Sequence, residues 1–404
     1  MLSLRLILSL IALSGAVAAG DAPLRASQGS LFAPSSAKSL GALTVAAGQT
    51  ITFDTGSASA APSVSGAVTG AGQLGVTQGG KTQTAVFAFD SIAIAQGATV
   101  RITGDRALVL LSKGTASIDA ALDVSGTAGS DSRRPAGEGG PGAEGGQRGT
   151  SVNSFPPPSD AGNGSFGNER DGIPGRGFGA GYNERCRGGT AGGGGGYGGK
   201  GGSASEGSKL LRLERQGVIL TATGGPVYGS DAFLDLWGGS GGAGAANDRN
   251  NDVAAGGGGG GAIAIIATTQ LTIGASGRIL ARGGNGGSHL ACGGGGSGGG
   301  IVLAAETVTI ANGAQVDASG GAGGSSSGDI SVISPKGRRN AASGGGGGGG
   351  RIAIFSKADL GGAGKNKLDA KTPAGVVLAG GKGGKGAQDG DDGLFYDGSW
   401  PGLR

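Results

Sequence analysis

The chain has 404 residues, of which 99 are glycine; 15% of the residues are charged, 4% are aromatic, and the formal net charge is +4. The low charge content argues against an ordinary charged disordered chain, and the lack of a basic run with interleaved aromatics gives nucleic-acid binding no support. A chain that is one quarter glycine has few side chains for chemistry, so the composition favours a structural protein over an enzyme.

Residues 1–18 have the pattern of a secretory signal peptide. Arg5 supplies a positive charge before the apolar run Leu6–Leu13, and Ala16-Val17-Ala18 is a small-x-small cleavage site. The apolar run is too short to span a bilayer, and no second long apolar run follows it. We therefore expect a secreted or cell-surface protein, on the extracellular or periplasmic side of the membrane, without a transmembrane span.

Residues 19–126 are expected to form dense short strands and contain the first copies of a repeat, U-x-U-x-x-Gly-x-x-U-x-U, where U is aliphatic or aromatic. Each U-x-U triplet alternates buried and exposed positions as a β-strand does, and the central glycine permits a turn. A β-hairpin or two sides of one coil of a parallel β-helix fit this pattern, and the irregular spacing of the copies favours the β-helix. In that arrangement, four aliphatic residues should stack in one file: Val45, Ile94, Ile273 and Ile310.

Residues 127–217 are predicted to be a loop insertion rich in glycine, proline and asparagine, with one short helix or strand at Ser208–Gln216. In residues 218–384, strands alternate with glycine blocks such as Gly344–Gly350, which hold more glycine than any turn requires. We expect these blocks to lie side by side in extended, polyproline-II-like form, because only glycine lets backbones approach and bond to one another in this way.

Residues 385–404 contain Leu394-Phe395-Tyr396 and Trp400. An open end of a stack of coils exposes strand edges, so we expect these aromatic residues to cap the last coil.

The segment Ala85–Gly104, followed by Ala107–Leu111, resembles segments of secreted bacterial glycine-rich proteins. In those proteins the next step is a Leu-Asp-x-Ser-Gly element and then glycine loops, and the corresponding step here is Ile118–Gly126. The glycine block before Arg351–Phe355 is similar to an element of large plant and bacterial glycine-rich surface proteins, and the repeat is similar to that of filamentous haemagglutinin-like adhesins. The resemblance implies a parallel β-helix on the cell surface or in the matrix, and it carries over no catalytic residue.

Cys186 and Cys292 are the two cysteines of the chain. Behind a signal peptide they are candidates for a disulfide bond, which would close a long loop and stabilise the fold by about 4–5 kcal/mol; two free thiols are the alternative. The single histidine, His289, precedes Cys292 as His-x-x-Cys. This pair lacks the further ligands of a metal site and the orienting partner of a catalytic nucleophile.

Two acidic segments are candidates for calcium, and solvated turn acids are the alternative at both. The first begins like a calcium loop but has Val253 and Gly259 where glycine and glutamate belong. The second faintly resembles the acidic cluster of β-helical pectin hydrolases, although the Gly-His-Gly and Arg-Ile-Lys elements of those enzymes are missing from the sequence. We expect no other cofactor. The candidate calcium ligands are Asp248, Asn250 and Asp252 in the first segment, and Asp389, Asp391 and Asp392 in the second.

These observations predict an all-β protein with a parallel β-helix or β-solenoid and long glycine-rich loops. The expected function is that of a non-catalytic structural or adhesive protein that binds cell-surface or matrix components, polysaccharide among them, with self-assembly as a further expectation. Two alternatives are a β-helical carbohydrate-binding or carbohydrate-active protein, similar to polysaccharide lyases and hydrolases, and a largely disordered matrix protein.

Overall fold

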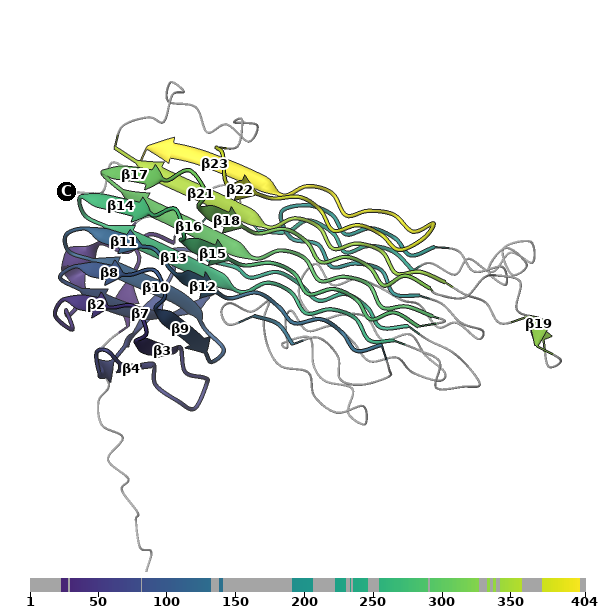
Figure 1. Cartoon of the computed structure of the whole chain (residues 1–404), viewed down its shortest axis with the longest axis horizontal. Helices are drawn as coiled ribbons and strands as arrows, with labels where there is room; N and C mark the ends of the chain where they lie inside the picture. Colours follow the sequence, from purple (N-terminus) through teal and green to yellow (C-terminus); the bar gives the residue numbers. More distant parts are fainter. Residues whose placement is uncertain are drawn as a thin grey trace, which may run out of the picture.

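A computed structural model describes residues 23–27, 30–80, 82–131, 138–140, 191–205, 222–229, 233, 235–245, 254–289, 291–326, 333–334, 337–338, 342–357 and 373–399. Within these residues the fold is all-β, and the one helical element is a 3-10 turn at Pro34–Ser36. Most strands lie parallel to their neighbours, stacked at one end of an elongated molecule (Figure 1). The expected signal peptide and Ser208–Gln216 lie outside the described residues.

The largest sheet, which we call the long sheet, has eight strands and runs the length of the stack. From β7 to β23 all its strands are parallel, whereas β6 pairs antiparallel with β7 near the N-terminal end. In order across the sheet, its strands are β1 (Leu24–Arg25), β6 (Gln73–Val76), β7 (Gln83–Phe89), β10 (Ala107–Ser112), β13 (Ala262–Ala267), β16 (Gly300–Ala305), β21 (Arg351–Ser356) and β23 (Leu394–Ser399).

Two further parallel sheets accompany the long sheet, and from β10 to β18 the chain visits the three in the same order each time. We call each such passage a rung; β10, β11 and β12 form one rung, and β13, β14 and β15 form the next. The second sheet contains β2 (Leu43–Val45), β8 (Ile92–Ile94), β11 (Ala116–Ile118), β14 (Gln270–Ile273) and β17 (Thr307–Ile310), and the third contains β12 (Ala121–Asp123), β15 (Arg278–Leu280), β18 (Gln315–Asp317) and β22 (Val376–Val377).

Antiparallel strands occur beside the first rungs and in one small separate sheet. The strand β3 pairs parallel with β9 and antiparallel with β4, which itself pairs antiparallel with β5. A change of strand direction ends the regular stacking, which limits strand addition at that end. These strands are β3 (Thr50–Asp54), β4 (Ser63–Gly66), β5 (Gly70–Ala71) and β9 (Thr99–Thr103), and the small sheet pairs β19 (Ile333–Ser334) with β20 (Gly337–Arg338).

The registers of the second sheet place its aliphatic residues in one file. Val45 is opposite Ile94, and Ile273 is opposite Ile310. Ile118 lies between Ile94 and Ile273 in the same file, which the repeat had not included. The expectation that these residues stack is therefore confirmed. Ile310, at the end of the file, is only partly buried and packs against the core.

The long sheet is buried on both faces, which explains its nearly continuous apolar strands. Leu110, Ile265 and Leu303 face the main core between the sheets, where Phe53 also contacts Phe87 edge-on with ring centroids 5.3 Å apart. The neighbouring positions of each strand face a second apolar cluster on the opposite side of the sheet, which includes Phe32, Phe233 and Leu236.

The main core makes a direct prediction about stability. Leu303→Ala removes a fully buried side chain from the middle of an inward-facing file, so the free energy of unfolding should fall by about 2–5 kcal/mol. Thr309→Ala, at an exposed position of β17, should change it by less than about 0.5 kcal/mol. Chemical denaturation measures both, and equal losses in the two variants would contradict the inward orientation of the file.

Candidate functional site

Beyond the sheets, glycine-rich segments of the chain extend side by side, and we call them the glycine bundle (Figure 1). Its outer row is made of the segments that follow strands of the third sheet, and its middle row is made of the segments that precede strands of the long sheet. Part of the expected loop insertion, residues 191–205, lies in a third row together with residues 238–245. The outer row comprises residues 124–131, 281–288, 318–325 and 378–385, and the middle row comprises residues 254–261, 292–299, 343–350 and 388–393.

The amides of Gly344–Gly350 point to three neighbouring segments in regular rotation. One amide donates to the preceding outer-row segment, residues 318–325, the next to the third row, and the next to the following middle-row segment, residues 388–393. A repeat of three residues matches a polyproline-II helix, whereas a β-strand repeats every two. The expectation that the glycine blocks lie side by side and bond to one another is confirmed. Amides donate from Gly344 to Gly324, Gly345 to Gly192, Gly346 to Gln388, Gly347 to Gly321, Gly348 to Gly195, Gly349 to Asp391 and Gly350 to Ala318, at 2.7–3.0 Å.

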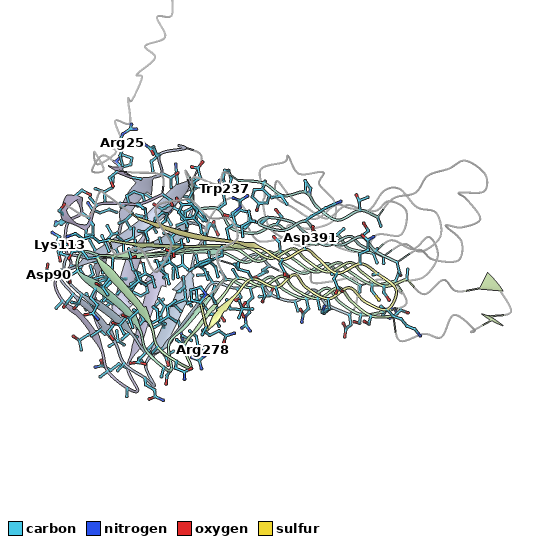
Figure 2. The ribbon with its side chains drawn as sticks, turned by 90° about the horizontal axis from the view of Figure 1, so that it is seen from above. Arg25, Asp90, Lys113, Trp237, Arg278 and Asp391 are labelled. Atoms are coloured by element: carbon cyan, nitrogen blue, oxygen red, sulfur yellow. The ribbon has the colours of Figure 1, made fainter. Side chains whose placement is uncertain are left out.

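Around Gly344–Gly350, the rows lie too close together to admit a side chain. A Cβ atom on Gly347 would lie 1.9 Å from the carbonyl oxygen of Gly296, and one on Gly348 would lie 2.2 Å from that of Gly199, far inside any normal contact. Because successive residues face different neighbours, every position of the segment must be glycine. Figure 2 accordingly shows side chains crowded around the sheets and sparse along the bundle.

The outer row is open to solvent on one side, and its exposure repeats every third residue. Arg282, Asn285 and Ser288 are exposed, while Gly284 and Gly287 are buried against the middle row. Three of the four segments of this row read as x-Gly-Gly triplets, whereas residues 124–131 have threonine and serine in place of the second glycine. In each segment, x carries a side chain about 9 Å from the next x. We call this surface the x-Gly-Gly face. Its x positions are Ser125, Ala128, Asp131, Arg282, Asn285, Ser288, Ser319, Ala322, Ser325, Ala379, Lys382 and Lys385.

Several x side chains also form hydrogen bonds between neighbouring outer-row segments. The Asn285 Oδ1 atom accepts the amide of Ala322 at 2.8 Å, and the Asp131 Oδ1 atom accepts the amide of Ser288 at 2.7 Å. A short side chain with an acceptor oxygen therefore satisfies an amide that has no main-chain partner at these positions. Reasoning from the sequence missed these residues, although the x-Gly-Gly spacing could have revealed them.

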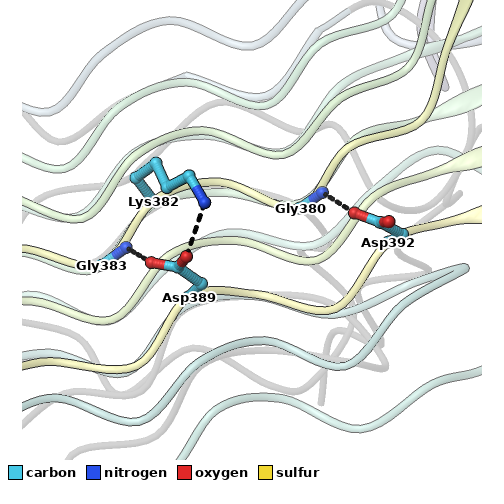
Figure 3. A network of polar contacts seen from close by, with 5 residues as sticks. All are labelled: Gly380, Lys382, Gly383, Asp389 and Asp392. Carbon is cyan, nitrogen blue, oxygen red and sulfur yellow. Dashed lines mark hydrogen bonds and ion pairs between the residues drawn. The ribbon is translucent and has the colours of Figure 1, made fainter.

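The last rung ends in two carboxylates. The Asp389 Oδ1 atom accepts the amide of Gly383 at 2.8 Å, and the Asp392 Oδ1 atom accepts the amide of Gly380 at 3.0 Å (Figure 3). The Lys382 ammonium donates to Asp389 at 2.8 Å. This ion pair and the Gly383 amide lower the pKa of the Asp389 carboxyl, and the ion pair raises the pKa of Lys382.

Of the two segments predicted to bind calcium, the structure describes only the one that contains Asp389, Asp391 and Asp392. Asp389 and Asp392 bind amides that are three residues apart along one segment, so their carboxylates serve separate partners. In the described part of the chain, no group of three or more His, Cys, Asp or Glu side chains is placed to hold a metal ion. The other candidate segment, which contains Asp248, Asn250 and Asp252, lies outside the described residues, and calcium binding stays a prediction.

Cys292 lies buried at the far end of the glycine bundle. Its thiol is free and contacts the main chain of His289, whose carbonyl oxygen lies 3.1 Å from Sγ. Burial raises the pKa of this thiol to about 11, which makes Cys292 a poor nucleophile at neutral pH. Cys186 lies outside the described residues. The pairing of the two cysteines therefore stays a prediction.

Aromatic residues join the glycine bundle to the long sheet. The Arg351 guanidinium lies 5.5 Å from the ring centroid of Tyr197 and donates to the carbonyl of Tyr228 at 2.8 Å. The rings of Tyr197 and Tyr228 are 4.8 Å apart, and Trp237 contacts Tyr228 edge-on. Burial raises the pKa of both tyrosines well above its ordinary value. This cluster fixes the third row against the strand β21, so we assign it a structural role.

No protein-family model, curated protein or solved structure matches this chain. In the part of the chain that the structure describes, no helix is long and apolar enough to cross a membrane.

The middle row makes a second prediction. Gly347→Ala places a methyl group against the carbonyl of Gly296, so the free energy of unfolding should fall by about 3 kcal/mol, the upper end of the range for overpacking. The control, Ala322→Ser, adds an atom at a half-exposed x position and should be nearly neutral. Thermal melting and amide exchange of Gly344–Gly350 measure both effects. An unchanged melting temperature for Gly347→Ala, with random-coil exchange across the block, would contradict the close packing.

Proposed function

We propose that the chain is a secreted structural or adhesive surface protein without catalytic activity, folded as a parallel β-solenoid from which a polyglycine bundle projects. The observation that carries this proposal is the x-Gly-Gly face. On this face, side chains recur every three residues along each segment, and hydrogen bonds between rungs align the segments. Such a surface suits an extended partner that is itself repetitive, such as a polysaccharide of the cell surface or matrix.

The construction of the bundle supports a binding role. The glycine segments have no side-chain rotamers to order, and their amides are already bonded to neighbouring segments. The face is therefore organised before a partner arrives, so binding costs little additional conformational entropy. The expected signal peptide and the resemblance to glycine-rich surface proteins support an extracellular location.

A pelleting experiment with insoluble polysaccharides tests this proposal. Labelled protein should sediment with cellulose, chitin, peptidoglycan sacculi or whole cells. The variant Ala128→Arg/Ala322→Arg/Ala379→Arg adds bulk to the face while removing no side-chain hydrogen bond, and its binding should fall at least tenfold.

The matched control, Ala93→Arg/Ser117→Arg/Thr309→Arg, adds the same charge at exposed positions of the second sheet and should bind like the wild type. Equal binding by the two variants, or no binding by the wild type to any of these materials, would refute an adhesive x-Gly-Gly face. Steady release of soluble sugar products would instead favour the alternative of a β-helical carbohydrate-active enzyme.

A further inference from the structure

We propose that Asp389 and Asp392 cap the last rung of the glycine bundle and keep a second copy of this chain from adding to it. Their carboxylates occupy the places of the main-chain carbonyl oxygens that a further rung would supply. The supporting observations are the direction of hydrogen bonds between rungs, the exception at the last rung, and the identity of the residues at that exception.

Main-chain to main-chain hydrogen bonds between outer-row segments run in one direction along the bundle. The glycine amides of one rung donate to the carbonyls of x residues in the next rung. Each outer-row segment therefore presents these glycine amides toward the C-terminal end and the x carbonyls toward the N-terminal end. The bonds are Gly283 to Ser319 at 2.9 Å, Gly286 to Ala322 at 2.8 Å, Gly320 to Ala379 at 2.9 Å and Gly323 to Lys382 at 2.8 Å.

The last outer-row segment has the same amides, on Gly380 and Gly383, but the described residues contain no further rung to accept them. The two carboxylates take up these amides instead, one each, at 3.0 and 2.8 Å. Figure 3 shows both side chains turned back from the neighbouring segment toward these glycines. The two carboxylates thus supply one acceptor for every third residue, which is the spacing of the main-chain acceptors in the other outer-row segments.

The register of the middle row explains why aspartate is tolerated there. Gly347 and Gly390 make equivalent bonds to the outer row, so Asp389 is the counterpart of Gly346 and Asp392 is the counterpart of Gly349. A Cβ atom on Gly346 would lie 1.9 Å from the carbonyl oxygen of Gly381 in the next rung. Beyond Asp389 and Asp392 no rung follows among the described residues, and both side chains are exposed. The change from glycine to aspartate therefore marks the end of the bundle.

A second copy of the chain carries the acceptors that fit an uncapped end. In the first outer-row segment, Ser125 and Ala128 occupy the places of Ser319 and Ala322, and in the described part of the chain no amide donates to their carbonyls. Neighbouring outer-row segments run parallel to one another, so a second copy would extend the row in the same direction. Contacts between unlike ends do not close on themselves, so uncapped molecules should form chains.

Sedimentation velocity and light scattering on two double variants and one single variant, each purified, test the proposal. Asp389→Ala/Asp392→Ala removes both acceptors, and its weight-average mass should at least double as concentration rises. Asp389→Asn/Asp392→Asn removes the same charge but keeps an acceptor oxygen at each position, so it should sediment like the wild type. Asp391→Ala changes an exposed aspartate between them and should also leave the mass unchanged.

Two results would overturn the proposal. An alanine double variant with the mass of the wild type would show that the carboxylates do not prevent association. Association of the asparagine variant to the same extent would show that charge repulsion, and not hydrogen-bond capping, keeps the molecules apart. Neither result depends on adhesion, so the proposed function would remain separately testable.

If the alanine double variant does not fold, the single variant Asp392→Ala provides a second measurement. It removes only the cap on Gly380 and leaves the Asp389–Lys382 ion pair in place. Amide exchange of Gly380 should accelerate at least tenfold while that of Gly383 stays within about twofold. Equal protection of Gly380 in the variant and the wild type would contradict a capping role.

Discussion

The structure depends on hydrogen bonds between backbones that lie closer together than any side chain allows. In Gly344–Gly350, successive amides donate to three different segments, so this segment is held from several sides at once. Ordering so much glycine carries a high cost in backbone entropy. Each hydrogen bond contributes only about 0.5–1.5 kcal/mol net, so the bundle needs many bonds made together and a scaffold that brings the segments into register.

The parallel sheets supply that register. Ile263, Ile301 and Ile352 stand opposite one another in neighbouring strands of the long sheet, and burial of these side chains fixes the alignment of their strands. Each of these strands is entered directly from a glycine segment of the middle row, so the alignment is passed to the bundle within one or two residues. The apolar core and the glycine bundle are thus parts of one repeating arrangement, and a shift in either would disrupt both.

Much of this arrangement could be predicted from the sequence, because the pattern of aliphatic residues and the placement of glycine blocks are local. The file that contains Ile94 and Ile273 follows from the repeat, and so does the side-by-side packing of the blocks. The third row could not be predicted, because residues 191–205 reach their neighbours only through long-range contacts. The sequence alone predicts candidate ligands or turn acids at Asp389 and Asp392, since the amides left without a main-chain partner become visible only when the rungs are assembled.

The most direct test of this account is an NMR measurement of scalar couplings across hydrogen bonds in isotopically labelled protein. The account predicts couplings from the amide nitrogen of Gly347 to the carbonyl carbon of Gly321, from Gly348 to Gly195, and from Gly349 to Asp391, with the same three partner segments recurring every third residue. Couplings that alternate between two neighbouring segments, as in a β-sheet, or no couplings across the block would contradict it.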